Sequence, residues 1–202
     1  MKDTKSEILN AAEQLFASRG PNATSLRKVI SRAKVNLAAI HYHFGSKESL
    51  LQTVLSRRLG PLNAERLALL DKYEQESGKR AVPLPKILEA LVGPALRLSR
   101  DSERGGAVFM RLLGRCVLEP DEKIQVMLNH QFHYVLERFT PALQRALPNL
   151  PPVDFFWRIH FLVGSMAHTM ADSERLRAIS GGLCDPDDIE GTIRRLVAFL
   201  NG

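Results

Sequence analysis

Apolar residues recur at the spacing of an α-helix along nearly the whole chain of 202 residues, and alternating strand patterns are almost absent. Runs of β-branched residues, which favour strands, are also few. The sequence therefore predicts an all-α protein. Because 45% of the residues are apolar, the chain can bury a substantial core, either in one large domain or in a small domain joined to a larger one.

Helix-end signals divide this pattern into separate helices. Thr4 to Glu7 has the form of a capping box, and Gly45 suits a left-handed C-cap. Gly60-Pro61 predicts a break in the chain, and Asp185-Pro186 predicts a cap for the last helix. We expect helices at residues 4–19, 25–33, 36–43, 46–59, 62–76, 84–101, 104–118, 121–147, 152–177 and 186–201.

Basic charge is concentrated in the first quarter of the chain. Residues 1–47 hold eight Lys and Arg against three Asp and Glu, whereas the remainder holds 20 against 19. A polyanion such as DNA is the natural partner of such a segment, although a solvated basic face accounts for the same composition.

Two short predicted helices, 25–33 and 36–43, are joined by the tight turn Lys34-Val35-Asn36, and Asn36 is a good N-cap. This spacing predicts a helix-turn-helix at about residues 25–44. We therefore expect an N-terminal three-helix DNA-binding module at 1–60 and a helical C-terminal domain for regulation and dimerisation at 61–202.

The second helix of this motif carries small side chains on its outer face. On a helical wheel, Leu37, Ile40 and Phe44 share one side, whereas Ala38 and Ala39 lie on the other. Exposed alanines leave a helix slender enough to enter the major groove of DNA, where their methyl groups can contact thymine methyls.

Hydrogen-bonding side chains flank this strip of alanines. His41, Tyr42 and His43 can reach phosphates or base edges, and Lys47 stands at the N-terminus of the next helix, where backbone N–H groups favour a phosphate. Each residue taken alone suits an ordinary surface, but the spacing of the whole motif favours DNA. His41 and His43 point in different directions on a helix and cannot share a metal ion.

Residues 25–47, with the sequence SLRKVISRAKVNLAAIHYHFGSK, resemble the helix-turn-helix of the TetR family of bacterial transcriptional regulators. Val35, His43, Phe44 and Lys47 fall in register with the family pattern, and the earlier stretch ILNAAEQLFASRG also matches. The resemblance covers roughly the first 60 residues.

Three positions depart from the family pattern. Ser25 replaces the common threonine, Lys34 replaces the turn glycine, and His41 replaces the common tyrosine, with Tyr42 directly after it. Lys34 must therefore adopt the backbone angle that the glycine would serve, and its charge can add a phosphate contact.

The resemblance implies binding to double-stranded DNA at a pseudo-palindromic operator. It assigns Arg27 as a base reader, and Leu37, Ala38 and Ala39 as the strip that enters the groove. The candidate DNA-binding residues are Ser25, Arg27, Lys34, Asn36, Leu37, Ala38, Ala39, His41, Tyr42, His43 and Lys47.

The family resemblance also implies a homodimer in which the last two long helices of each chain form a four-helix bundle. Both segments carry apolar stripes, which suit either such an interface or the internal core. The candidate interface residues are Phe155, Ile159, Leu162, Val163, Met166, Ile193, Leu196, Val197 and Leu200.

Within the family, residues 36–71 are most similar to the PsrA-type regulators of fatty-acid metabolism. This similarity implies a repressor that a small hydrophobic ligand, a fatty acid or an acyl-CoA, releases from DNA. Arg104, Arg111 and Arg115 lie beside an apolar stripe, which suits an apolar cavity with a cation at its mouth. Solvated or ion-paired arginines are the alternative.

Two histidines in the following helix, His130 and His133, could line the same cavity. With Glu137 they could alternatively hold a metal ion, but no further ligand is evident and we expect no metal site. The candidate ligand-binding residues are Phe109, Arg111, Leu113, Arg115, His130 and His133.

The sequence lacks the signals that are typical of other classes of protein. The charged N-terminus and the absence of a long apolar run predict a cytoplasmic protein without a membrane partner. Cys116 and Cys184 have no metal-binding spacing, no cofactor is expected, and no phosphate loop, nucleophile elbow or HExxH motif indicates an enzyme. The alternatives are a regulator of efflux or stress genes that responds to another hydrophobic compound, and a ligand-independent DNA binder.

Overall fold

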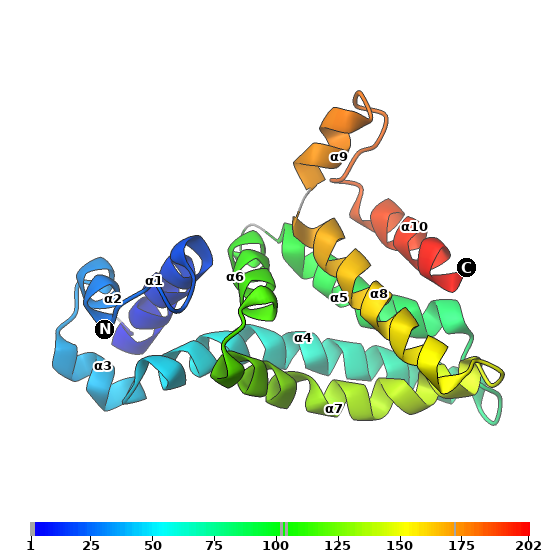
Figure 1. Cartoon of the computed structure of the whole chain (residues 1–202), viewed down its shortest axis with the longest axis horizontal. Helices are drawn as coiled ribbons and strands as arrows, with labels where there is room; N and C mark the ends of the chain where they lie inside the picture. Colours follow the sequence, from blue (N-terminus) through cyan, green and yellow to red (C-terminus); the bar gives the residue numbers. More distant parts are fainter. Residues whose placement is uncertain (1–2, 102, 104, 172) are drawn as a thin grey trace. The chain divides into compact units, whose positions relative to one another are not determined.

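A computed structural model describes residues 3–101, 103, 105–171 and 173–202. Over these residues the protein is all-α, as predicted, with ten helices and no strand (Figure 1). Arg104 of the predicted arginine stripe lies outside the described residues. The helices are α1 (Thr4–Arg19), α2 (Leu26–Ala33), α3 (Leu37–Phe44), α4 (Lys47–Ser77), α5 (Leu84–Arg100), α6 (Gly106–Leu118), α7 (Glu122–Ala146), α8 (Pro152–Ala171), α9 (Ser173–Ile179) and α10 (Ile189–Asn201).

The chain forms two compact units. Unit 1 comprises Met1–Pro61 and Gly105–Gln131, and unit 2 comprises Leu62–Arg104 and Phe132–Gly202. Unit 1 thus combines the N-terminal helices with α6 and the beginning of α7. The boundaries fall inside α4 and α7, so each of these two helices contributes residues to both units.

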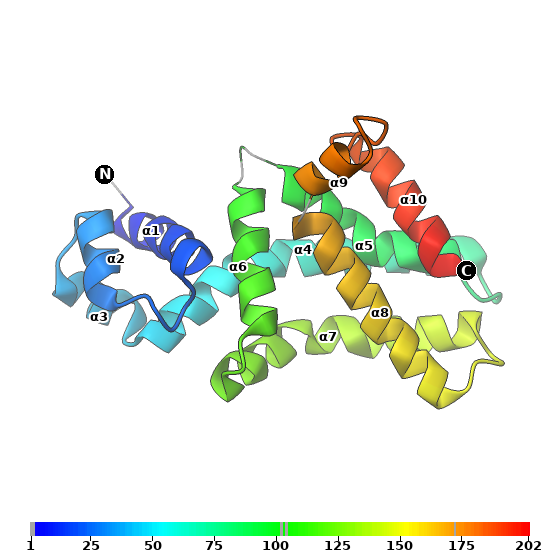
Figure 2. The same cartoon turned by 45° about the horizontal axis from the view of Figure 1, so that its top comes forward.

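The core of unit 1 is built around α1. This helix packs against α2, α3 and α6, and Figures 1 and 2 both show it beside α2 and α6. Ile8, Phe16, Val29 and Ile40 are completely buried between these helices. Each such side chain contributes roughly 1.5–3 kcal/mol through burial, which fixes the orientation of the short helices α2 and α3.

The core of unit 2 lies between α5, α7, α8 and α10. The closest pair is α5 with α10, and α8 contacts both (Figure 2). Ile87 and Leu96 of α5, Phe139 of α7 and Phe155 of α8 are buried together in this core. This arrangement makes the inner faces of α8 and α10 part of the subunit's own interior.

The predicted break at Gly60-Pro61 is wrong, because α4 continues from Lys47 to Ser77 with Pro61 inside the helix. A proline removes one backbone hydrogen bond and normally kinks or ends a helix. Leu59 and Leu62 on either side of it are buried, so packing holds the helical turn where local preference opposes it.

Two predicted helix starts are also corrected. The N-cap of α1 is Asp3, whose Oδ1 accepts a hydrogen bond from the Lys5 backbone N–H at 3.1 Å, so the expected capping box at Thr4 is not formed. The N-cap of α10 is Asp188 in place of Asp185-Pro186, because Asp188 Oδ1 accepts the Gly191 N–H at 2.8 Å. In both cases the aspartate directly before the first helical residue accepts a free N–H group of the first turn.

The predicted helix at 152–177 corresponds to α8 and α9, on either side of residue 172. In the described part of the chain, no helix is long and apolar enough to cross a membrane.

Candidate DNA-binding site

The turn between α2 and α3 is held in an unusual backbone conformation. Lys34 has φ 53° and ψ 43°, which lies in the left-handed helical region that favours glycine. Among the residues that the structure describes, no other residue except glycine has a positive φ. The Val35 N–H donates to the Ile30 carbonyl at 3.2 Å across this turn. The lysine therefore adopts the angle that the turn requires, as the sequence predicts.

The N-caps of both helices are side chains identified in the sequence. Ser25 Oγ accepts a hydrogen bond from the Lys28 N–H at 3.4 Å, and Asn36 Oδ1 accepts one from the Ala39 N–H at 2.8 Å. These caps fix where α2 and α3 begin, and consequently which residues of α3 face outward.

Helix α3 is anchored in unit 1 by Ile40 and Phe44, both of which are buried. The opposite face is open to solvent: Ala38 is exposed, Ala39 is half-buried, and Tyr42 has 86% of its surface exposed. A narrow strip of methyl groups followed by a phenol is thus presented outward, which is the arrangement that the helical wheel predicts.

Leu37 does not lie on the buried side as the wheel suggested, because 50% of its surface is exposed. It is the first residue of α3, where no preceding helical turn covers it. Its exposure agrees instead with its predicted place in the strip beside Ala38.

The polar side chains at the end of α3 differ in how freely they can reach a ligand. His41 Nδ1 lies 3.1 Å from the Gly45 carbonyl, and His43 is half-buried with its ring edge-on to Tyr42 at a centroid distance of 5.0 Å. Gly45 has a positive φ of 72°, but its ψ of −56° lies outside the left-handed helical region expected for the cap. His41 and Tyr42 are exposed to solvent, whereas His43 is not fully exposed.

Lys47 is half-buried, and its Nζ donates a hydrogen bond to the Pro21 carbonyl at 3.1 Å. An ammonium group has three N–H donors, so this bond to the α1–α2 loop leaves others for a phosphate. Arg27 in α2, Lys34 in the turn and Asn36 before α3 are exposed. The lysines and the arginine can bind phosphates of DNA, which positions a helix in the groove but carries no sequence information.

The pairing of α1 with α4 through a buried carboxylate was not predicted. Glu13 is 3% exposed, and its carboxylate accepts hydrogen bonds from Arg57 Nη2 at 2.5 Å and from Arg58 Nη2 at 3.0 Å. The signal available in the sequence was an acid at a position that shares a helix face with Leu9 and Phe16. Two arginines one residue apart can then neutralise it.

The six candidate ligand-binding residues are not brought together around a described cavity. Phe109 is buried in unit 1, Leu113 is half-buried, and Arg111 is exposed. Arg115 is exposed and donates to the Ser18 carbonyl at 3.2 Å. The histidines are also exposed, with His133 Nε2 lying 3.2 Å from Glu137 Oε1 and His130 directed to solvent on the same helix.

The candidate dimer residues mostly face the interior of unit 2. Phe155, Leu162, Ile193 and Leu196 are buried in its core, whereas Val163 is exposed. The other four, which pack against that core, are Ile159, Met166, Val197 and Leu200.

A second apolar face of α8 is directed outward. Phe156, Trp157 and Phe161 are each more than half exposed, and the rings of Trp157 and Phe161 are stacked at a centroid distance of 5.6 Å. On α10, Phe199 is likewise exposed. Large apolar side chains gathered in this way on a surface indicate an interaction site.

Two family descriptions match this chain. Residues 8–54 match the description "Bacterial regulatory proteins, tetR family", and residues 89–202, more than half of the chain, match "Tetracyclin repressor-like, C-terminal domain".

Curated relatives include a transcriptional repressor of Mycobacterium tuberculosis, which is 46% identical over 54 residues, 27% of this chain and 29% of the relative. The transcriptional repressor BepR of Brucella suis is 32% identical over 114 residues, 56% of this chain and 51% of the relative. The chain thus spans at most about half the length of these relatives.

Solved structures share the fold at low sequence identity. FadR of Bacillus subtilis, whose structure is a complex with stearoyl-CoA, is 13% identical with a TM-score of 0.64, over 98% of this chain and 97% of that one. The fatty acid degradation regulator FadR of Bacillus halodurans is 15% identical with a TM-score of 0.65 over the same shares of each chain. With its N-terminal helix-turn-helix and with more than half of its length matched by the C-terminal description, the chain belongs to the TetR family of transcriptional regulators.

Proposed function

We propose that this protein is a homodimeric repressor that binds a pseudo-palindromic operator through α3 and leaves it when a small hydrophobic ligand binds. The observation that carries the DNA-binding part is the outward strip of Leu37, Ala38 and Ala39, held by buried Ile40 and Phe44. Residues 1–60 would read the DNA, and residues 61–202 would sense the ligand and dimerise.

In this proposal, contacts to the bases and contacts to the phosphates have different tasks. Ala38 and Ala39 enter the major groove, and Arg27 reads a base edge from α2. The residues around them bind mainly phosphates and set the register of the helix. These are Ser25, Lys34, Asn36, His41, Tyr42, His43 and Lys47.

The dimer that we propose uses the outer apolar face of α8 and α10, because the inner face is already covered within the subunit. Phe156, Trp157 and Phe161 supply an aromatic centre of the kind that protein interfaces favour, and Phe199 extends it. A two-fold axis through this face pairs the same residues of both chains and presents two reading heads to two half-sites.

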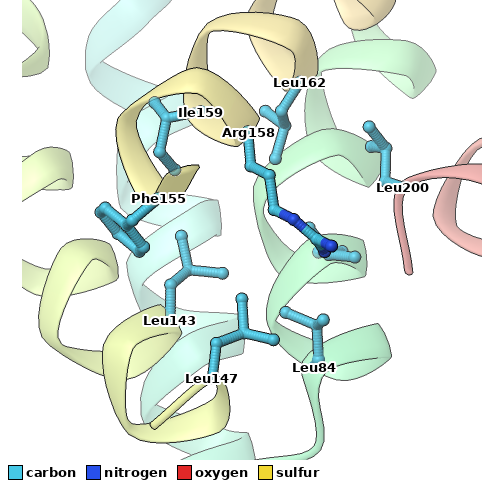
Figure 3. Close-up of a pocket in the computed structure, with 9 residues that line it drawn as sticks. Leu84, Leu143, Leu147, Phe155, Arg158, Ile159, Leu162 and Leu200 are labelled. Carbon is cyan, nitrogen blue, oxygen red and sulfur yellow. The ribbon is translucent and has the colours of Figure 1, made fainter. Parts of the chain in front are cut away.

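The ligand that we propose is a fatty acid or an acyl-CoA. The similarity of residues 36–71 to PsrA-type regulators supports this class, and the stearoyl-CoA complex of FadR has the same fold. Unit 2 contains an apolar pocket of about 30 Å³, and Arg158 is among the residues that line it (Figure 3). This volume accommodates little more than a water molecule, so an acyl chain requires the surrounding helices to move apart.

Release from DNA needs only that the ligand binds more tightly to a conformation in which the two heads do not fit the operator. A coupling free energy of about 1–3 kcal/mol changes DNA affinity roughly 5- to 150-fold. Helix α4 begins at Lys47 and runs into unit 2, so we propose it as the element that carries this coupling.

Genomic footprinting with the purified full-length protein tests the DNA-binding part, since it yields both the operator and the neighbouring genes. Fluorescence anisotropy on that operator, with and without oleate or oleoyl-CoA, tests the ligand class. Operator binding that neither compound changes removes the fatty-acid proposal and leaves the regulator of efflux or stress genes, or the ligand-independent binder. No protected site at low salt removes the repressor itself.

A further inference from the structure

Arg66 on α4 is the most deeply buried arginine described in unit 2, with 3% of its surface exposed. Its Nε donates to the Leu91 carbonyl at 2.8 Å, and its Nη1 donates to Asn63 Oδ1 at 3.2 Å. Its Nη2 donates to the Met166 sulfur at 3.9 Å, a long and weak contact. Among the described residues, no carboxylate forms an ion pair with this guanidinium.

A buried cation that forms no ion pair is expensive, because it loses its hydration. Burial lowers the pKa of Arg66 to about 10, so the group still carries its charge at neutral pH. The charge of Glu65, next to it in the sequence, raises the pKa of Arg66 by less than burial lowers it. Its five N–H donors have three neutral acceptors, one of them a weakly accepting thioether. The buried Glu13 of the same chain shows the usual solution, since two arginines neutralise it.

The position of Arg66 relates it to the apolar pocket of Figure 3. Leu88 of α5 and Leu162 of α8 line that pocket. Leu91 and Met166, which contact the guanidinium, lie three and four residues further along the same two helices. At 1.5 Å rise per residue, these steps correspond to roughly 4.5–6 Å, which is about one helical turn.

We propose that Arg66 is an internal anion-binding residue for the carboxylate of an amphiphilic compound whose apolar part occupies the widened pocket between α5 and α8. The inference rests on the proposed function in that this compound would be its ligand. The outer edge of the guanidinium, Nη1 and Nη2, is the part that a carboxylate can bind with two hydrogen bonds. Met166 is unbranched and flexible, so its side chain can move to admit the group.

Arg158, which lines the pocket and is exposed to solvent, offers a second cation. A carboxylate bound there would gain little, because an exposed ion pair is screened by water. It would also leave the Arg66 charge uncompensated. Pairing at Arg66 neutralises both buried groups at once, and the inner site is therefore the one proposed.

The first test compares acids with neutral analogues of the same length on the full-length wild-type protein. Isothermal titration calorimetry is carried out with octanoate and laurate, and with octanol and dodecanol. A hydrogen-bonded charge pair predicts that each acid binds about 10- to 100-fold more tightly than its alcohol. Equal binding of acid and alcohol, or no binding of either acid, overturns the proposal without any variant.

The second test uses matched variants to find which arginine causes the preference for acids over alcohols. Arg66→Met replaces the guanidinium by an apolar side chain of similar length, and Arg158→Met makes the same change at the outer cation. We expect Arg66→Met to bind the alcohols as the wild type does and to lose the preference for acids, whereas Arg158→Met keeps it. Loss of the preference in Arg158→Met alone overturns the assignment. If Arg66→Met does not fold, Arg66→Lys, which keeps the charge but not the fork, is expected to weaken the preference.

Operator binding of the same samples separates this inference from the proposed function. Acid binding that depends on Arg66 but leaves operator affinity unchanged supports the inference and contradicts ligand-controlled release. Release of DNA by laurate that is the same in wild type and Arg66→Met supports the proposed function and overturns the inference.

Discussion

The left-handed conformation of Lys34 leads to a prediction in which two substitutions at one position separate folding from DNA binding. Lys34→Gly and Lys34→Ala both remove the same positive charge. They differ in backbone freedom, because alanine keeps the Cβ atom that makes φ 53° and ψ 43° unfavourable and glycine does not.

The expected difference in the free energy of unfolding follows from two opposing effects. A residue with a Cβ atom in the left-handed region costs roughly 1–2 kcal/mol, whereas glycine loses roughly 0.5–1 kcal/mol more conformational entropy on folding. Lys34→Gly should therefore be about 0.5–1 kcal/mol more stable than Lys34→Ala, a rise of about 1–4 °C in melting temperature. Lys34→Ala should have the same free energy of unfolding as the wild type.

Chemical denaturation of the three proteins measures this difference. Ser31, exposed and inside α2, supplies a control of opposite sign, because Ser31→Gly should be about 1 kcal/mol less stable than Ser31→Ala at a helical position. If Lys34→Gly is no more stable than Lys34→Ala while the Ser31 pair behaves as expected, the turn does not hold the left-handed angle. In salt titrations of operator binding, both Lys34 variants should lower the slope by about one if Lys34 contacts a phosphate.

Three further predictions concern other parts of unit 1 and the two thiols. Ala38→Glu should lower operator affinity at least about tenfold in anisotropy titrations, because it places a carboxylate against phosphates. Its circular dichroism spectrum should stay unchanged. Full operator affinity of this variant would mean that α3 does not enter the groove. Glu13→Gln should destabilise the protein by about 3 kcal/mol in thermal unfolding, since two partly buried arginines lose their counter-charge, and an unchanged melting temperature would contradict that reading. Burial raises the pKa of the Cys116 thiol to about 12, so iodoacetamide at pH 8 should label the exposed Cys184 and leave Cys116 unlabelled until denaturant is added, as mass spectrometry can check.

Local signals in the sequence were sufficient for the helix-turn-helix. Asn36 caps α3 with its own side chain, and the spacing of Ile40 and Phe44 sets which face is buried. Both depend on interactions between residues a few positions apart, for which helical periodicity and capping rules hold. The backbone angle of Lys34 could be predicted because the family pattern has a glycine at this position.

The face of α8 that meets the core could not be assigned in this way. Phe155 and Leu162 lie on one side of this helix, and Trp157 and Phe161 lie on another. Both sets repeat at helical spacing, so periodicity indicates an apolar face without telling which of two it is. Packing of α5 and α10 against α8 decided that the first set is interior.

By itself, therefore, the sequence determined the all-helical class, the helix-turn-helix and the outward strip of α3, because these follow from neighbours along one helix. Only the tertiary structure decided that α4 continues through Pro61, that Glu13 meets Arg57 and Arg58, and that Arg66 lies buried beside Met166. Each of these depends on contacts between side chains dozens of residues apart or on packing that overrides local preference. An arginine in a helix looks the same in the sequence whether water or a core surrounds it.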